Sequence, residues 1–320
     1  MAVIFLLLIV LVVYIFWDNN RITVAEQEIL IDELPEQLEG FTILQISDLH
    51  EKVFGENQEE LIDAINSVDY DAIVFTGDML DGVDSENYIP FYKILEGITN
   101  KENAWYVPGN ADPASYQLHP IFEKSEFVKG IEKRGVELLE SMDTVTIEGA
   151  NVHFVDFELS IIKNPRNIGE INGVVMPIHG GNNHYLAHQK QLWEELTVLD
   201  ELKASDVLIA LNHYPVVDKR VDYIQSDAVT ELRDFDLLIA GHYHGGQIRL
   251  PFLGALFVPE AWYENGGFFP PQDRVKGLWE YKNIKQYVST GLGSSDAISF
   301  LKFRLFNPPQ INVLTLKKGN

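Results

Sequence analysis

The sequence predicts an α/β fold that follows one N-terminal apolar helix, and three observations support this prediction. Short apolar runs of β-favouring residues recur along the chain, and each is continuous, as in buried strands. Segments with helical spacing of apolar residues separate these runs, and such alternation is typical of layered α/β domains. The chain also begins with a long uncharged segment that differs in kind from the rest.

Five of the expected strands end in polar residues that are capable of chemistry. These runs occupy residues 41–50, 70–80, 103–112, 206–215 and 234–247. Helices are expected at 56–68, 85–98, 127–135 and 184–203, and further strands within 141–160 and 284–318. Because ligands bind at the carboxyl ends of strands in such sheets, the polar residues there are candidates for a functional site.

The N-terminal segment MAVIFLLLIVLVVYIFW has no charge, Gly or Pro, and it reaches the lower length limit for a membrane-spanning helix. A cleaved signal peptide is the alternative, but no Lys or Arg precedes the run and no small-x-small cleavage site follows it. We therefore expect a single-pass anchor in the cell membrane at 1–18, a connector at 19–40 and one domain at 41–320. Arg21 is the one positive side chain close behind the span, so the side of the membrane stays open.

Composition excludes several classes of function. The chain has 320 residues and a formal net charge of −24, and such acidity repels nucleic acid, so no nucleic-acid partner is expected. The chain has no Cys, which excludes disulfides, thiolate nucleophiles and Cys-ligated zinc.

Carboxylate, imidazole and amide groups gather where the expected strands end. Asp48 and His50 would leave the first strand on the same face, because strand side chains repeat every two residues. Gly77, Gly109 and Gly241 each precede a candidate and permit a sharp turn. Oxygen and imidazole ligands suit manganese, iron, zinc or magnesium, and two such ions that share a carboxylate can clamp a phosphoryl group. The candidate ligands are Asp48, His50, Asp78, Asn110, His213, His242 and His244.

Short motifs in the chain carry a family resemblance. They are SDLH (47–50), GDMLDG (77–82), GNAD (109–112), NHYP (212–215) and GHYHGGQ (241–247). In these motifs the sequence resembles the calcineurin-like metallophosphoesterase superfamily, over roughly residues 41–317. The ending STGLGSS…FRLFNPPQINVLTL is similar to the membrane-anchored bacterial branch, which includes Tat-exported phosphoesterases and a pyrophosphatase of UDP-diacylglucosamine. The resemblance implies a four-layer αββα sandwich of two mixed sheets.

The resemblance also implies a site and an activity. It implies two divalent metal ions, with manganese favoured, and catalytic roles for Asp78, Asn110 and His213. The implied reaction is hydrolysis of a phosphodiester or pyrophosphate by a hydroxide that bridges the metals. The substrate would be a phosphorylated small molecule or lipid, for example UDP-2,3-diacylglucosamine. The implied ligands are Asp48, His50, Asp78 and His244 for one ion, and Asp78, Asn110, His213 and His242 for the other.

Ala111 departs from the family pattern, in which a His follows the Gly-Asn pair and assists the leaving group. General acid assistance is worth roughly 10²–10⁴ in rate. Three explanations stay open. The chain is a weakened enzyme or a metal-binding scaffold, or another histidine takes the place of the missing one. Alternatively, the leaving group needs no acid, as in pyrophosphates and activated diesters. The substitutes are His119, His179 and His184, of which His184 is the predicted substrate-binding residue. The alternative for His184 is a plain loop before a helix that Asn183 caps.

The stretch 251–271 is rich in aromatic residues and directly follows the last ligand motif. Two interpretations stay open. The stretch packs beneath a long loop, or it forms an apolar flap beside the metals that grips an acyl chain or enters a bilayer. Its large side chains are Phe252, Leu253, Leu256, Phe257, Trp262, Tyr263, Phe268 and Phe269.

Overall fold

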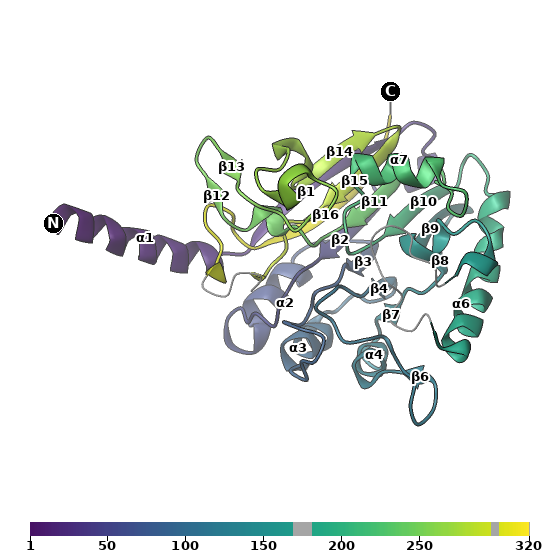
Figure 1. Ribbon diagram of the computed structural model, residues 1–320, viewed down its shortest axis with the longest axis horizontal. Coiled ribbons are helices and arrows are strands. Elements are labelled where there is room, and N and C mark those ends of the chain that lie inside the picture. The colour runs from purple at the N-terminus through teal and green to yellow at the C-terminus, as the bar shows by residue number, and fades with distance from the viewer. Residues whose placement is uncertain (169–180, 296–300, 320) are drawn as a thin grey trace.

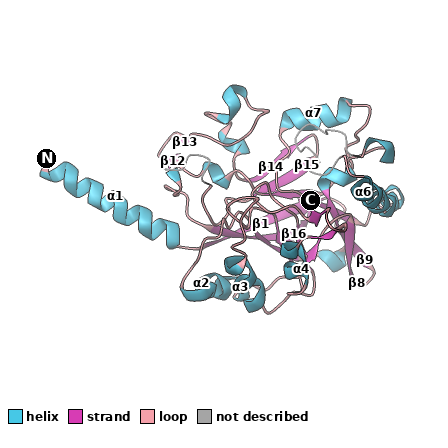
Figure 2. Ribbon diagram, turned by 60° about the horizontal axis from the view of Figure 1, so that its bottom comes forward, coloured by secondary structure: helices cyan, strands magenta, loops and turns pink. Residues whose placement is uncertain are grey.

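The computed structural model describes residues 1–168, 181–295 and 301–319. Helix α1 (Ala2–Asn20) projects from the rest of the chain in Figures 1 and 2, and nearly all of its side chains are exposed. Its 19 residues are long and apolar enough to cross a membrane, although a signal sequence has the same properties. The N-terminal apolar helix expected from the sequence is therefore present.

The first sheet is mixed, because β16 runs antiparallel to β2 while the other neighbouring pairs run parallel. Its described strands lie in the spatial order β1 (Thr23–Ile31), β16 (Gln310–Lys318), β2 (Thr42–Ile46), β3 (Ala72–Phe75), β4 (Ala104–Tyr106) and β7 (Glu137–Leu138).

Strand β1 lies within residues 19–40, which we expected to form a connector. It pairs with β16 in parallel along its whole length, from Thr23 opposite Gln310 to Ile31 opposite Lys318. Its side chains alternate between the two faces, and two of the four exposed ones, Glu26 and Glu28, are polar. A search for continuous apolar runs passes over such an edge strand, since only strands buried on both faces read as continuous runs.

The second sheet is also mixed, because β14 and β8 run antiparallel to their neighbours at its two edges while the inner pairs run parallel. Its described strands lie in the order β14 (Gly277–Tyr281), β15 (Ile284–Val288), β11 (Leu237–Ala240), β10 (Val207–Leu211), β9 (Ala150–Asp156) and β8 (Met142–Ile147). The predicted α/β fold is confirmed, with two mixed sheets among the described residues.

Helices follow the strands as the alternation predicted, although several are shorter than their expected ranges. The α-helices after α1 are α2 (Glu59–Asn66), α3 (Ile89–Gly97), α4 (Glu126–Glu132), α5 (Phe157–Ser160), α6 (Asn183–Glu195) and α7 (Asp218–Ser226). Short 3-10 helices span Glu36–Leu38, Glu56–Gln58, Pro165–Asn167, Leu196–Glu201, His244–Gly246, Glu264–Gly267 and Gln272–Arg274. Two small hairpins pair β5 (Tyr116–Gln117) with β6 (Glu123–Lys124), and β12 (Arg249–Leu250) with β13 (Gly254–Ala255).

Buried side chains on both faces of each sheet explain the continuous apolar runs. In β3, Val74 points into a core between the sheets, while Ile73 and Phe75 point into a core beneath α2, α3 and α4. In β10, Ile209 faces the core between the sheets, while Leu208 faces a core that also contains residues of α5, α6 and α7. The sheets therefore stack face to face, and the helices lie on their outer faces (Figure 1).

Candidate metal centre

The loops after β2 and β3 run side by side and carry three of the candidate ligands. Asp48 N donates to Gly77 O at 2.9 Å. His50 N donates to Asp78 O at 3.0 Å. Asp48, His50 and Asp78 have φ angles of 52°, 47° and 56°, in the left-handed region that residues other than glycine rarely adopt. Since β2 ends at Ile46, our reason for their common direction was wrong: the left-handed backbone, not strand periodicity, brings Asp48 and His50 together.

One buried cluster consists of Asp48, His50, Asp78 and His244. His50 Nε2 lies 3.5 Å from Asp78 Oδ2 and 3.2 Å from His244 Nε2. His244 Nε2 lies 3.6 Å from Asp48 Oδ1. One ligand atom from each residue lies within 4.8 Å of the others, so the four side chains converge on one point.

A second cluster shares Asp78 with the first and adds His213 and His242. His213 Nε2 lies 3.3 Å from Asp78 Oδ2 and 3.1 Å from His242 Nδ1. It also lies 3.2 Å from Oδ1 of Asn110, which is an exposed residue. The structure thus brings all the candidate ligands into two adjacent groups, with Asp78 in both.

The hydrogen bonds of the His213 and His242 imidazoles leave a nitrogen lone pair of each ring directed at the other ring. His213 Nδ1 lies 2.8 Å from the carbonyl oxygen of Thr76, which requires the proton on Nδ1. His242 Nε2 lies 3.3 Å from the carbonyl oxygen of Pro259, which places the proton of a neutral ring there. His213 Nε2 and His242 Nδ1 then face each other, and His213 Nε2 also faces the oxygens of Asp78 and Asn110. In the neutral rings neither of these nitrogens carries a proton to donate. A cation between these atoms removes the repulsion, so the donor set fits a divalent metal.

The pKa values of His213 and His242 in the protein without metal also indicate that a positive charge belongs between these side chains. Burial lowers the pKa of His213, but the carboxylates of Asp78 and Asp48 outweigh it and raise this pKa to about 9. Burial and the charge of His213 lower the pKa of His242 to about 3. A proton on His213 therefore occupies the place of the cation, and metal binding at neutral pH must displace it.

Glycines let the loops approach the shared carboxylate closely. A Cβ on Gly109 would lie 2.2 Å from both the backbone nitrogen and Oδ1 of Asp78. A Cβ on Gly241 would lie 2.1 Å from Ser47 Oγ and 2.6 Å from Asp48 Oδ2. Of these three glycines, only Gly77 has a left-handed φ, +81°. Gly109 and Gly241 are required for close approach instead.

Comparison with known proteins assigns the family. Residues 41–246 match the profile of the family described as Calcineurin-like phosphoesterase. This chain belongs to the calcineurin-like phosphoesterases. The matched region contains all seven candidate ligands, so the family assignment and the buried clusters refer to the same residues.

Individual relatives extend the similarity over most of the chain. The uncharacterized metallophosphoesterase YkuE of Bacillus subtilis (strain 168) is 25% identical over 316 residues, which cover 95% of this chain and 89% of YkuE. The uncharacterized metallophosphoesterase Cj0846 of Campylobacter jejuni is 26% identical over 97% of this chain and 68% of its own length. The UDP-2,3-diacylglucosamine pyrophosphatase LpxG of Chlamydia muridarum (strain MoPn / Nigg) is 23% identical over 87% of this chain and 84% of LpxG.

Asp112 supports the centre of this phosphoesterase, and the sequence analysis did not single it out. Its buried carboxylate accepts the backbone N–H groups of Asp78 at 2.8 Å, Met79 at 2.8 Å and Gly109 at 2.9 Å. It also accepts the hydroxyl of Tyr106 at 2.8 Å. Asp112 thereby ties the loop after β3 to the loop after β4. Its signal was the GNAD motif, in which it directly follows Ala111.

Arg304 is the second supporting residue that the sequence analysis missed. Its fully buried guanidinium donates to the carbonyl oxygens of Gly293 at 2.6 Å, Thr290 at 2.6 Å and His244 at 3.3 Å. Asn307 Nδ2 donates to the same His244 oxygen at 2.6 Å. These bonds fix the loop that carries His244. The sequence feature that could have pointed to Arg304 is its position as a charged residue inside the apolar segment FRLFN.

The histidines considered as substitutes at position 111 do not join the clusters in any described contact. His184 is exposed in the first turn of α6, and the described contact of its backbone is with Asn182 at 2.9 Å. Asn182, and not Asn183, caps this helix. His119 is exposed, and His179 lies outside the described residues. The backbone N–H of Ala111 donates to Asp78 Oδ1 at 2.7 Å, so this position still contributes to the centre through its backbone.

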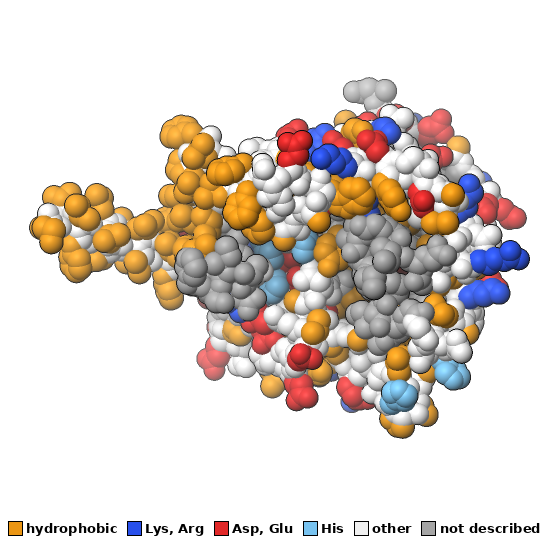
Figure 3. All heavy atoms as spheres, in the orientation of Figure 1, with side chains coloured by type: hydrophobic (Ala, Val, Ile, Leu, Met, Phe, Trp, Pro, Cys, Tyr) orange, Lys and Arg blue, Asp and Glu red, His pale blue; other side chains and the backbone are white. Residues whose placement is uncertain are grey.

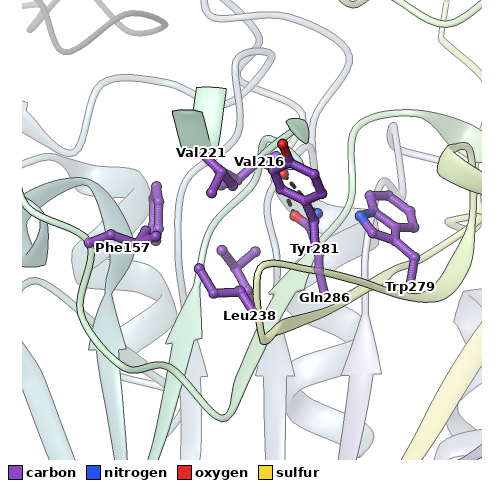
Figure 4. A pocket seen from close by; sticks show the side chains of 9 residues that line it. Phe157, Val216, Val221, Leu238, Trp279, Tyr281 and Gln286 are labelled. Atoms are coloured by element: carbon purple, nitrogen blue, oxygen red, sulfur yellow. Dashed lines mark hydrogen bonds between the residues drawn. The ribbon is translucent and has the colours of Figure 1, made fainter. Parts of the chain in front are cut away.

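A small apolar cavity lies between α7 and the second sheet, and no candidate ligand lines it (Figure 4). Gln286 contributes an amide side chain to the lining of the cavity. This side chain accepts a hydrogen bond from Val216 N at 2.7 Å and donates one to Val216 O at 3.1 Å. This polar group is therefore satisfied, and the cavity offers no site for phosphoryl chemistry. Its lining residues are Phe157, Val216, Val221, Leu232, Leu238, Trp279, Tyr281, Ile284 and Gln286.

Proposed function

We propose that this calcineurin-like phosphoesterase is a membrane-anchored hydrolase of phosphodiester or pyrophosphate bonds that works with two divalent cations. The observation that carries the proposal is Asp78, whose carboxylate belongs to both buried clusters. Manganese is the first cation to test, with iron, zinc and magnesium as alternatives, because imidazole and oxygen ligands accept all four. We also propose that the domain is the four-layer αββα sandwich of the family. The apolar cores on the outer faces of both sheets support this architecture.

Each cluster would hold one cation. A pair of cations held there would supply electrostatic stabilisation of the phosphoryl oxygens and lower the pKa of water. The proposed ligands are Asp48, His50, Asp78 and His244 for one cation, and Asp78, Asn110, His213 and His242 for the other.

The chain itself positions these groups. The Nδ1–H of His213 is held by the carbonyl of Thr76, so Nε2 keeps its lone pair directed at Asp78 and Asn110. Asn110 is the exposed member, so we assign it to the side from which substrate arrives. The N–H groups of its amide would orient the substrate phosphate, while His213 and the shared carboxylate of Asp78 would act as ligands of the cations beside it.

Ala111 supports a substrate with a weakly basic leaving group. A methyl group replaces the acid that the family usually places there, and no described contact brings another histidine to this position. Alkoxides need a proton to leave, whereas phosphate groups of pyrophosphates and activated diesters leave without one. LpxG is described as a UDP-2,3-diacylglucosamine pyrophosphatase, and it supports a lipid-linked pyrophosphate as the substrate class to test first.

The proposed location is the cell membrane, with α1 as a retained single-pass anchor. The end of this helix is bonded to the domain, since Asn19 Nδ2 donates to Arg304 O at 2.7 Å and Arg304 N donates to Asn19 Oδ1 at 2.7 Å. A signal sequence that is removed on export does not need such contacts with the mature domain.

Activity on defined substrates tests the proposal. Purified full-length protein with added manganese should cleave bis-p-nitrophenyl phosphate and UDP-2,3-diacylglucosamine. Asp78→Asn and His213→Ala should each lower kcat/KM by at least about 100-fold, since both remove a ligand of the cation pair. Variants that cleave as well as the wild type would show that the site is elsewhere.

A metal-binding scaffold is the second candidate, and Ala111 is the observation that favours it. Ala111→His would restore the family pattern. A protein without native activity on any diester or pyrophosphate, but with a large gain on a phosphomonoester after this substitution, would support a scaffold derived from an enzyme. Purified protein without bound transition metal in elemental analysis would support it further.

A further inference from the structure

An apolar tip projects from the domain beside the end of α1. It connects β12 to β13, and its side chains Phe252 and Leu253 are 108% and 63% exposed. Figure 3 shows hydrophobic side chains gathered over this hairpin and continuing onto α1. In both Figures 1 and 2 the hairpin lies on the side from which α1 projects. Large side chains exposed to this extent are typical of surfaces that meet an apolar partner.

Helix α1 leaves the domain in a fixed direction. The paired hydrogen bonds between Asn19 and Arg304 hold its last turn, and the amine of Lys52 donates to the carbonyl oxygen of Asn19. One helical turn earlier, the ring of Tyr14 packs against Phe306 with 5.1 Å between the centroids. The anchor therefore sets the orientation of the whole domain.

The end of α1 has the side chains of a membrane interface. Trp17 is 55% exposed, and the guanidinium of Arg21 lies 4.7 Å from the centre of its ring. Aromatic rings with a nearby basic group are typical of the headgroup level. Phe306 is 44% exposed and, through its contact with Tyr14, links this level to the domain.

The charge of the hairpin also suits a lipid surface. The chain has a net charge of −24, yet residues 245–258, GGQIRLPFLGALFV, contain no Asp or Glu and one Arg. A segment that combines exposed aromatic and aliphatic side chains with a basic residue binds the interface of a bilayer.

We propose that the β12–β13 tip, Phe306 and the end of α1 form one docking surface, and that its occupant is the lipid bilayer. Arg304 connects this surface to the metal centre, since the same residue pairs with Asn19 and donates to the carbonyl of His244 at 3.3 Å. If the proposed function holds, it follows from this docking that the metal centre acts on phosphate groups at the headgroup level of the membrane.

Site-directed spin labelling tests the docking directly, because the chain has no native cysteine. Full-length Phe252→Cys would be spin-labelled and reconstituted in bilayers of phosphatidylcholine with phosphatidylglycerol. The matched control is Val198→Cys, a 44% exposed apolar position in the 3-10 helix Leu196–Glu201, beyond α6. The label at 252 should collide with oxygen in preference to a water-soluble nickel chelate, and the label at 198 should show the reverse. Equal exposure of both labels to the chelate would overturn the proposal. Spin–spin coupling between labels at 252 would overturn it in favour of a second copy of the chain.

Kinetics separate this proposal from the proposed function. The double variant Phe252→Ser with Leu253→Ser should lower kcat/KM for UDP-2,3-diacylglucosamine in vesicles by at least about tenfold, because a polar tip would no longer dock on the bilayer and hold the metal centre at the headgroup level. Its kcat/KM for bis-p-nitrophenyl phosphate in solution, and both activities of Val198→Ser, should not change. An equal fall on both substrates, or no fall on the lipid substrate, would contradict the docking. A wild-type protein that cleaves neither substrate would contradict the proposed function, while the labelling result would still decide the docking.

Discussion

Asp112 shows how single buried residues hold the centre together. Its carboxylate accepts backbone N–H groups from the loops after β3 and β4. Burial raises the pKa of Asp112, the charge of Asp78 adds to this effect, and the bonds from Gly109, Tyr106 and Leu80 oppose it. These donors therefore offset part of the cost of burying this carboxylate.

We expect Asp112→Asn to reduce the free energy of unfolding by about 2–4 kcal/mol, because the amide nitrogen would face N–H donors. Urea denaturation followed by circular dichroism measures this change. Asp143→Asn is the control, since Asp143 accepts from the indole of Trp105 at 3.0 Å away from the centre. The control should change stability by less than about 1 kcal/mol. Equal stabilities of Asp112→Asn and wild type would mean that Asp112 does not organise these loops.

His213 makes the affinity for metal dependent on pH. Burial alone would lower its pKa, but Asp78 and Asp48 raise it to about 9 in the protein without metal, so the ring is protonated at neutral pH. A histidine must be neutral to bind a metal, so each unit of pH below that value should weaken manganese binding about tenfold for this one displaced proton. Isothermal titration between pH 6 and 8 checks the slope. An affinity that does not change over this range would show that His213 is not a ligand.

At the scale of elements, β1 makes the N-terminal segment part of the domain. The strand pairs with β16 along its length and buries Ile29 and Ile31 in the core between the sheets. Its neighbour β16 also pairs with β2, which leads into the metal centre. Loss of β1 would therefore expose the edge of a strand that supports the centre.

Truncations test this role of β1. Removal of residues 1–20 should leave a folded domain, because nearly all the side chains of α1 are exposed. Removal of residues 1–40 should give aggregated or unfolded protein, since it exposes the apolar side chains that β1 covers. Circular dichroism and size-exclusion chromatography distinguish the two outcomes. A folded monomer after the longer truncation would show that residues 19–40 are a connector after all.

The short helix α5 begins at a carboxyl group whose proton depends on folding. Asp156 caps α5 and accepts from Leu159 N at 2.8 Å, while burial raises its pKa to about 7. The unfolded chain releases this proton near pH 4. The folded state therefore binds the proton more tightly, and this group lowers stability progressively as the pH rises from about 4 to about 7.

Asp156→Asn keeps the cap and removes the ionisation. The variant should be more stable than the wild type by about 1–2 kcal/mol at pH 8, and the difference should shrink toward pH 4. Thermal denaturation at several pH values measures it. A difference that is constant across pH would mean that Asp156 has an ordinary pKa in the folded protein.

The elements also show what the sequence could and could not predict. Continuous apolar runs located β2, β3, β4, β10 and β11, because these strands are buried on both faces. The same criterion passed over β1, an edge strand with alternating burial. Motifs located the ligands, whereas Asp112 and Arg304 act through backbone groups that are distant in sequence. Only the folded chain shows which amides and carbonyls those residues meet.

At the scale of the whole molecule, the two sheets meet at the centre. Asp48, His50, Asp78 and Asn110 follow strands of the first sheet, and His213, His242 and His244 follow strands of the second. The stacking of the sheets over their shared core sets the distance between these groups. The function proposed for this phosphoesterase thus depends on the packing of the entire domain, and the membrane location that we propose depends on α1 and the β12–β13 tip.

The metal content of the purified protein tests the central claim most directly. Full-length protein dialysed against manganese at pH 8 should bind two ions per chain by elemental analysis, because Asp78 completes both clusters. Asp78→Asn should bind at most one, and an exposed substitution such as Asp273→Asn should still bind two. A wild-type protein that binds no manganese, iron or zinc under these conditions, or an Asp78→Asn variant that still binds two ions, would contradict the account.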